Sequence, residues 1–204
     1  MGRSDVTAVT ITADTVALDA DGISTVAAVA NNAALVINGA LTSGGSATLS
    51  HGRIVTLLSS ADDSAISFTV VGTDVNGDAQ TETITGADTG TATGAAYFLT
   101  ISSITAVGDP AANVSAGVNA SAADVVFAGR ARLKGIYLTS TATAGTTNFL
   151  TSSPVGTSVF KLSSVALATA TRDVVIPEDG VLFTSGIYIQ YTVSTFLTMT
   201  VFHA

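Results

Sequence analysis

Apolar and polar residues alternate in short runs along the whole chain, and turn residues separate one run from the next. A period of two places successive side chains on opposite faces of a β-strand. Short strands that follow one another in this way are typical of a β-sandwich or barrel. The pattern predicts strands at Val6–Thr12, Thr15–Leu18, Ile23–Val29, Leu35–Ile37, Ala47–Leu49, Arg53–Leu58, Ile66–Val75, Ala79–Thr85, Tyr97–Thr105, Val125–Ala128, Ala131–Thr139, Thr147–Leu150, Ser158–Leu162, Arg172–Ile176, Val181–Thr184, Ile187–Val193 and Leu197–His203.

The clearest local signal is a β-hairpin centred on Asn76-Gly77. This dipeptide tolerates positive φ at both central positions of a type I′ turn, which would place Val75 opposite Asp78 and Phe68 opposite Thr85. With this register, one face is expected to be buried and contains Ile66, Phe68, Val70, Ala79, Thr81 and Thr83. The other face is expected to show Thr69, Thr73, Gln80 and Glu82.

The fold class expected from these patterns is all-β, with two tandem antiparallel β-sandwich or barrel-like domains and an extended N-terminal segment. The expected ranges are 1–34 for the N-terminal strands, 35–128 for the first domain and 129–204 for the second. The small, polar stretch from Gly108 to Asp124 is interpreted as an interdomain linker or a loose sheet edge. The segment before Leu35 is either an arm that reaches a neighbouring subunit or an ordinary edge strand.

Composition and charge narrow the classes of partner. The chain is 47% hydrophobic, which is enough for a sizeable core, and its net charge of −8 argues against nucleic acid as a partner. Its mean hydropathy is +0.55, but asparagines at positions 31, 32 and 38 interrupt the most apolar stretch, so no membrane partner is expected. The one basic cluster, Arg130, Arg132 and Lys134, is interpreted as an exposed strand start in preference to an anion site. The absence of cysteine excludes disulfides and thiolate chemistry, and no export signal is recognised.

Few residues offer catalytic chemistry. Only His51 and His203 could act as a base at neutral pH, and no GxSxG motif supplies a nucleophilic serine. The two glutamates, Glu82 and Glu178, lie in separate blocks of the chain, although aspartates could still supply a carboxylate pair. No Walker-type phosphate loop is present. We therefore predict a protein that is not an enzyme, with no catalytic, cofactor-binding or metal-binding residues and no cofactor.

One acidic cluster resembles a calcium-binding loop in its spacing. Asp74, Asn76 and Asp78 stand at positions one, three and five, but the glycine is Gly77, whereas an EF-hand needs it where Ala79 stands. A hairpin tip explains the same residues without a metal, because short aspartate side chains bond their own turn backbone.

Two parts of the chain resemble virion structural proteins of tailed bacteriophages. The first is Leu35–Gly108, in which the hairpin sequence GTDVNGDAQTET precedes a strand that contains ISSI. The second comprises Leu133–Phe149 and Ile176–Ala204, with the sequence DGVLFTSGIYI near the C-terminus. These motifs are structural and carry no catalytic residues, so the resemblance implies a non-enzymatic virion protein.

The leading functional hypothesis is a capsid decoration, or cement, protein that binds the outside of the phage shell and stabilises it. Its expected partners are itself, as a homotrimer or homodimer, and the major capsid protein, and its expected location is the virion, assembled in the host cytoplasm. One alternative is a component of the phage tail, baseplate or fibre. Another is a carbohydrate-binding or adhesive β module, against which the lack of Trp and the position of Tyr188 and Tyr191 on opposite strand faces both count.

Overall fold

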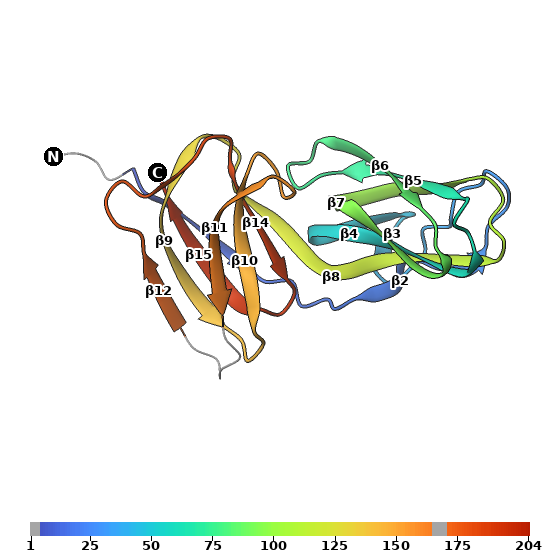
Figure 1. Ribbon diagram of the computed structural model, residues 1–204, viewed down its shortest axis with the longest axis horizontal. Coiled ribbons are helices and arrows are strands. Elements are labelled where there is room, and N and C mark those ends of the chain that lie inside the picture. The colour runs from blue at the N-terminus through green and yellow to red at the C-terminus, as the bar shows by residue number, and fades with distance from the viewer. Residues whose placement is uncertain (1–4, 165–170) are drawn as a thin grey trace. The chain divides into compact units, whose positions relative to one another are not determined.

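The computed structural model describes residues 5–164 and 171–204, and in these residues the protein is all-β (Figure 1). The described part of the chain forms fifteen strands and no helix, and the strands make two sheets, of five and ten strands. The strands are β1 (Thr7–Thr12), β2 (Asp19–Ala28), β3 (Thr42–Ser43), β4 (Ser46–Asp62), β5 (Ser67–Thr73), β6 (Ala79–Thr85), β7 (Asp88–Val107), β8 (Asn113–Phe127), β9 (Ala131–Ser140), β10 (Gly145–Thr151), β11 (Thr157–Ser164), β12 (Thr171–Val175), β13 (Val181–Phe183), β14 (Ile187–Thr192) and β15 (Phe196–His203).

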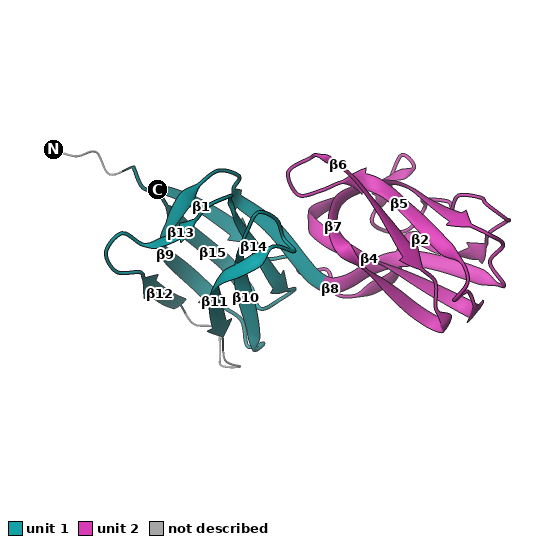
Figure 2. Ribbon diagram, turned by 45° about the horizontal axis from the view of Figure 1, so that its top comes forward, with its two compact units in different colours: residues 1–15, 121–204 teal, residues 16–120 magenta. Residues whose placement is uncertain are grey.

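The chain divides into two compact units, coloured separately in Figure 2. Unit 1 contains Met1–Thr15 and Ser121–Ala204, and unit 2 contains Val16–Ala120. These limits differ from the expected ranges of 1–34, 35–128 and 129–204 for two reasons. β1 pairs with β15 and so belongs with the C-terminal part of the chain, and β8 begins in unit 2 and ends in unit 1.

Unit 2 is built around two long strands, β4 and β7, which pair with each other. Its strand order is β6-β5-β7-β4-β8, and β2 and β3 pair with β8 and β4 respectively. The residues that form its core have apolar side chains without solvent exposure on several of these strands, among them Leu57, Phe68, Phe98, Ile101 and Ile104. The burial of each such side chain contributes about 1.5–3 kcal/mol.

The stretch from Gly108 to Asp124, interpreted as an interdomain linker or a loose sheet edge, does carry the chain from unit 2 into unit 1, but it does so as the paired strand β8. Val114, Ala116 and Val118 are fully buried, and β8 pairs with β4, β2 and β14. The small side chains that made this stretch read as a linker allow other elements to approach it closely. At Gly117, for example, a Cβ atom would overlap the carbonyl oxygen of Asp19.

Unit 1 follows the sequence prediction closely. All seven strands expected after Gly129 are present within one to two residues of the expected limits, as β9 to β15. The five-stranded sheet has the order β1-β15-β9-β12, with β13 also on β9, and the other strands follow the order β11-β10-β14-β8. β1 pairs with β15 of its own chain and, among the described strands, has no second neighbour in this sheet.

Several strand limits in the first half of the chain differ from the prediction. No strand covers Thr15–Leu18 or Leu35–Ile37, although the backbone N–H of Leu35 donates to the carbonyl of Ile104. The two short strands expected at Ala47–Leu49 and Arg53–Leu58 belong to the single strand β4. The sequence signal was interrupted because β4 and β7 contain bulges that shift the alternation of inward and outward side chains.

The hairpin of β5 and β6 exists, but its register is shifted by one residue from the prediction. Phe68 lies opposite Ile84, where the type I′ turn had placed it opposite Thr85. Of the two central residues of the expected turn, only Gly77 has positive φ, 87°, and its N–H donates to the carbonyl of Asp74 at 3.1 Å. The loop is therefore one residue longer, a type I turn followed by a left-handed glycine.

This shift exchanges the two faces of β6. Thr81 and Thr83, expected inside, are exposed, and Gln80 and Glu82, expected outside, are partly buried. On β5 the expected burial of Phe68 is confirmed.

Glu82 binds the main bulge of β7. Tyr97 pairs with Ile54 and Thr93 pairs with Thr56, so residues 94–96 lie outside the regular ladder with β4. Glu82 Oε1 accepts hydrogen bonds from the backbone N–H groups of Ala95 at 2.5 Å and Ala96 at 3.2 Å. Gly94 makes room for this carboxylate, because a Cβ atom there would lie 2.5 Å from Oε2. Side chains of β6 thus bind the backbone that the bulge removes from the sheet.

Substituting Glu82 tests this contact. Glu82→Ala should lower the free energy of unfolding by about 1–3 kcal/mol, because it leaves two N–H groups without their acceptor. Glu82→Gln should change it by less than about 1 kcal/mol, since the amide oxygen can still accept both bonds. Chemical denaturation followed by circular dichroism measures both values.

Thr83→Ala is the matched control, because Thr83 is the exposed neighbour on the same strand. Equal losses for Glu82→Ala and Thr83→Ala would show that the carboxylate does not stabilise the bulge.

Candidate functional site

The four residues considered for acid–base chemistry are divided between the two units. His51 and Glu82 lie in unit 2, whereas Glu178 and His203 lie in unit 1. His51 is in the irregular stretch of β4, and Glu178 is in the turn between β12 and β13 with a φ of 56°. Glu82 is bonded to β7, as described above.

The acidic residues with calcium-like spacing build the hairpin tip. Asp74 Oδ1 accepts from the backbone N–H groups of Asn76 at 2.8 Å and Asp78 at 3.0 Å. Asn76 Nδ2 donates to Asp74 Oδ2 at 3.2 Å. One carboxylate thus organises the whole turn. Among the described residues, no group of three or more histidine or acidic side chains could hold a metal ion.

Two members of the basic cluster hold a neighbouring turn. Lys134 Nζ donates to the carbonyl of Asp179 at 2.9 Å, and Arg132 Nη1 donates to the carbonyl of Gly180 at 3.3 Å. Both residues are partly buried on β9, while Arg130 is exposed just before this strand. The cluster lies at a strand start, as expected, but Arg132 and Lys134 are only partly exposed, and these two cations bind backbone carbonyls of the β12–β13 turn.

The sequence analysis did not single out Arg53, which is the largest fully buried side chain of the described chain. Its guanidinium Nη2 donates to the carbonyls of Asn119 and Ala17, which are far apart in sequence. Arginine cannot lose its charge in a protein and carries five N–H donors, so it can join several backbone acceptors at once. The only sequence signal was an isolated arginine in an otherwise apolar strand.

Tyr191 joins three segments of unit 1. Its hydroxyl donates to Asp124 Oδ2 at 3.1 Å and accepts from the backbone N–H of Asp14 at 3.3 Å, and its ring lies 4.8 Å from that of Phe196. Burial, and then the negative charge of Asp124, raise the pKa of Tyr191 far above its usual value. The hydroxyl therefore stays protonated and acts as a structural hydrogen-bond donor.

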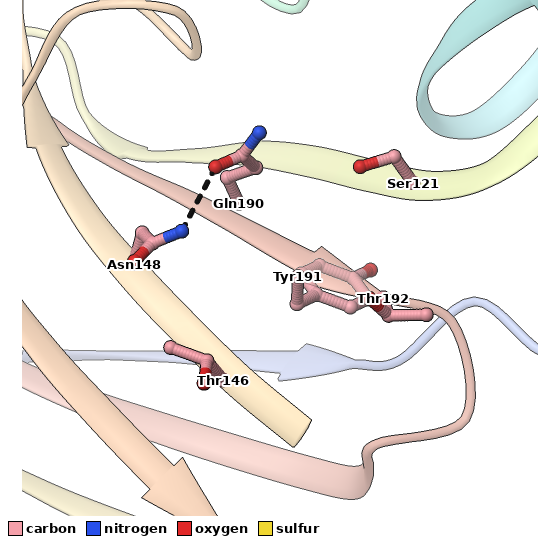
Figure 3. Close-up of a pocket in the computed structure, with 6 residues that line it drawn as sticks. All are labelled: Ser121, Thr146, Asn148, Gln190, Tyr191 and Thr192. Carbon is pink, nitrogen blue, oxygen red and sulfur yellow. Dashed lines mark hydrogen bonds between the residues drawn. The ribbon is translucent and has the colours of Figure 1, made fainter.

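A pocket of about 330 Å³ opens beside Tyr191 in unit 1 (Figure 3). Its lining comes from β8, β10 and β14 and consists of Ser121, Thr146, Asn148, Gln190, Tyr191 and Thr192. Asn148 and Gln190 are cross-strand neighbours, and Asn148 Nδ2 donates to Gln190 Oε1 at 3.0 Å. Asn148 Oδ1 is buried and accepts no hydrogen bond from the described residues.

The side chains that line this pocket are uncharged and polar. Hydroxyl and amide groups both donate and accept hydrogen bonds, and neither carries charge. No carboxylate, histidine or cation contributes to the lining, so the pocket contains no group that would act as a general base near neutral pH. It suits an uncharged polar ligand.

None of the described residues forms a helix with the length and hydropathy that a membrane span requires.

His203 is a packed side chain of unit 1. It is 6% exposed, and its ring centroid lies 5.0 Å from that of Phe127. Burial lowers the pKa of His203 below its ordinary value of 6.5, because the charged imidazolium loses hydration.

This burial predicts a pH dependence of stability. Between the lowered folded pKa and 6.5, the unfolded chain binds more protons at this position than the folded chain does. The contribution of His203 to the free energy of unfolding should therefore be greatest above pH 6.5. It should fall as the pH falls toward the folded pKa of His203. Urea denaturation at a series of pH values between about 5 and 8 measures the slope.

His203→Phe should flatten this slope, and His51→Gln should leave the contribution of His203 in place. An unchanged pH dependence in His203→Phe would contradict the assignment.

Comparisons with known proteins found no relative of this chain. No protein-family model matches the chain, and neither a curated protein sequence nor a solved structure is significantly similar to it.

Proposed function

We propose that this protein is a non-enzymatic structural component of a tailed-bacteriophage virion, and specifically a decoration protein on the outside of the capsid. The observation that carries the proposal is the role of the residues behind the phage resemblance. Asp74 builds the hairpin turn, Glu82 binds the β7 bulge, and Asp179 accepts from Lys134 in the second motif. The motifs specify shape, which is what a structural component needs.

The outer face of unit 2 supports a role in binding a protein surface. On β5, β6 and β7 this face is neutral, and its side chains are Ser67, Thr69, Val71, Thr81, Thr83, Thr85, Ser103, Thr105 and Val107. Depletion of charge is the compositional mark of the centre of protein interfaces. In the proposal, the major capsid protein is the partner of this face, other copies of the chain are further partners, and each unit is one β-sandwich domain.

The copy number of this protein in purified virions tests the proposal. We expect a ratio to the major capsid protein near one copy per few shell subunits, measured by quantitative mass spectrometry. A ratio of a few per cent would instead favour the tail, baseplate or fibre. Absence of the protein from virions would overturn the structural role in the particle.

The neutral pocket of unit 1 supports a second candidate, a carbohydrate-binding module. Sugar hydroxyls match its amides and hydroxyls, and Asn148 Oδ1 is an acceptor without a described partner. Against this candidate, Tyr188 and Tyr191 are buried and offer no stacking surface.

A glycan array followed by calorimetry tests this candidate. For any glycan that binds, Asn148→Ala should weaken affinity at least tenfold, whereas Asn31→Ala, an exposed asparagine of unit 2, should not change it. Binding that Asn148→Ala leaves intact, or an array without a hit, would remove the pocket from consideration.

A further inference from the structure

Most edge strands of this protein carry features that discourage pairing with another chain. Inward charges, outward charges and short length are the usual features of protected edges. β6 carries the inward Glu82, β11 carries Lys161, and β12 carries Arg172 and Asp173. β13 is protected by its length of three residues.

Among the edge strands that the structure describes, β1 lacks these features. Its sequence, TAVTIT, contains no charged residue, proline or glycine over six residues. It pairs with β15 through the full register from Thr7–His203 to Thr12–Thr198, and no other strand of the described chain pairs with its second side. Ala8, Thr10 and Thr12 are exposed, whereas Ile11 is buried.

We propose that β1 pairs antiparallel with β1 of a second copy of this chain, which joins the five-stranded sheets of two copies around a two-fold axis. The inference rests on the self-association in the proposed function and names the surface that carries it. An isologous contact needs a segment that complements itself. With Thr10 opposite the partner's Thr10, Val9 lies opposite the partner's Ile11, so inward side chains meet inward ones.

Charge does not oppose a second copy at this edge, although the chain as a whole is acidic. Each chain carries a net charge of −8, so two copies repel each other wherever their acidic residues approach. β1 contains none of these residues, and it can form main-chain hydrogen bonds along its free edge without bringing charged side chains together. Added salt should therefore strengthen the association, because it screens the repulsion between copies, whereas a contact made of ion pairs would weaken.

Sedimentation equilibrium of the full-length protein over a wide concentration range tests the inference. The wild type should form a dimer, and Thr10→Lys should raise the dimer dissociation constant at least tenfold. Thr157→Lys, which places the same charge on an exposed threonine of edge strand β11, should leave the constant unchanged. Thermal melts of both variants, and Ala8→Lys as a second change on β1, separate loss of pairing from loss of folding.

Three outcomes would overturn the inference: a wild type that stays monomeric at all concentrations, a closed trimer, or a dimer that Thr10→Lys and Ala8→Lys leave intact while folded. None of these outcomes changes the copy number in virions, so the proposed capsid function would survive them. Conversely, a β1 dimer of a protein that virions lack would refute the capsid function alone.

Discussion

The contact between Glu82 and the bulge of β7 is the constraint on which unit 2 depends. β7 leaves the ladder with β4 at residues 94–96, and the freed N–H groups need acceptors that the sheet cannot supply. Glu82 supplies one oxygen to two of them, and Gln80 Nε2 donates to the carbonyl of Tyr97 at 2.9 Å beside them. These polar side chains can face inward only because the hairpin register is shifted by one residue. The turn at Asp74 and Gly77 thus determines how β6 meets β7.

This dependence explains which parts of the fold could be predicted. In unit 1 the register shifts between paired strands are of one residue each, and β9 to β15 still follow from the pattern of apolar residues. In unit 2 the bulges of β4 and β7 break the alternation, and a single residue in the turn decides which face of β6 is buried. Only the end of β8 was predicted, as the strand Val125–Ala128. Its first part was missed because Gly117 and its small neighbours carry no alternating signal, although close packing around them requires such small residues.

In the candidate site, too, the features that depend on sequence neighbours could be predicted, and those that depend on distant residues could not. The prediction that Arg132 and Lys134 begin a strand depended on neighbours in the sequence, and the structure agrees with it. The polar pocket depends on residues of three strands that are distant in sequence, and nothing in the sequence links Ser121 to Asn148 or Gln190. Arg53 was not recognised as buried for a similar reason, because its acceptors at Ala17 and Asn119 come together only in the folded chain.

Several of the aspartates that produce the negative net charge stabilise turns by accepting hydrogen bonds from backbone N–H groups. Asp62 accepts from the hydroxyl and the backbone N–H of Ser64, and this bonding lowers the pKa of Asp62. Asp74 organises the hairpin turn, and buried Asp63 accepts from the N–H of Ala111 at 2.8 Å. Aspartate is favoured in such turns because its short side chain reaches the local backbone. Much of the negative charge therefore lies where strands end, and the neutral strand faces and the edge of β1 remain as the surfaces where two acidic molecules can meet at the lowest electrostatic cost.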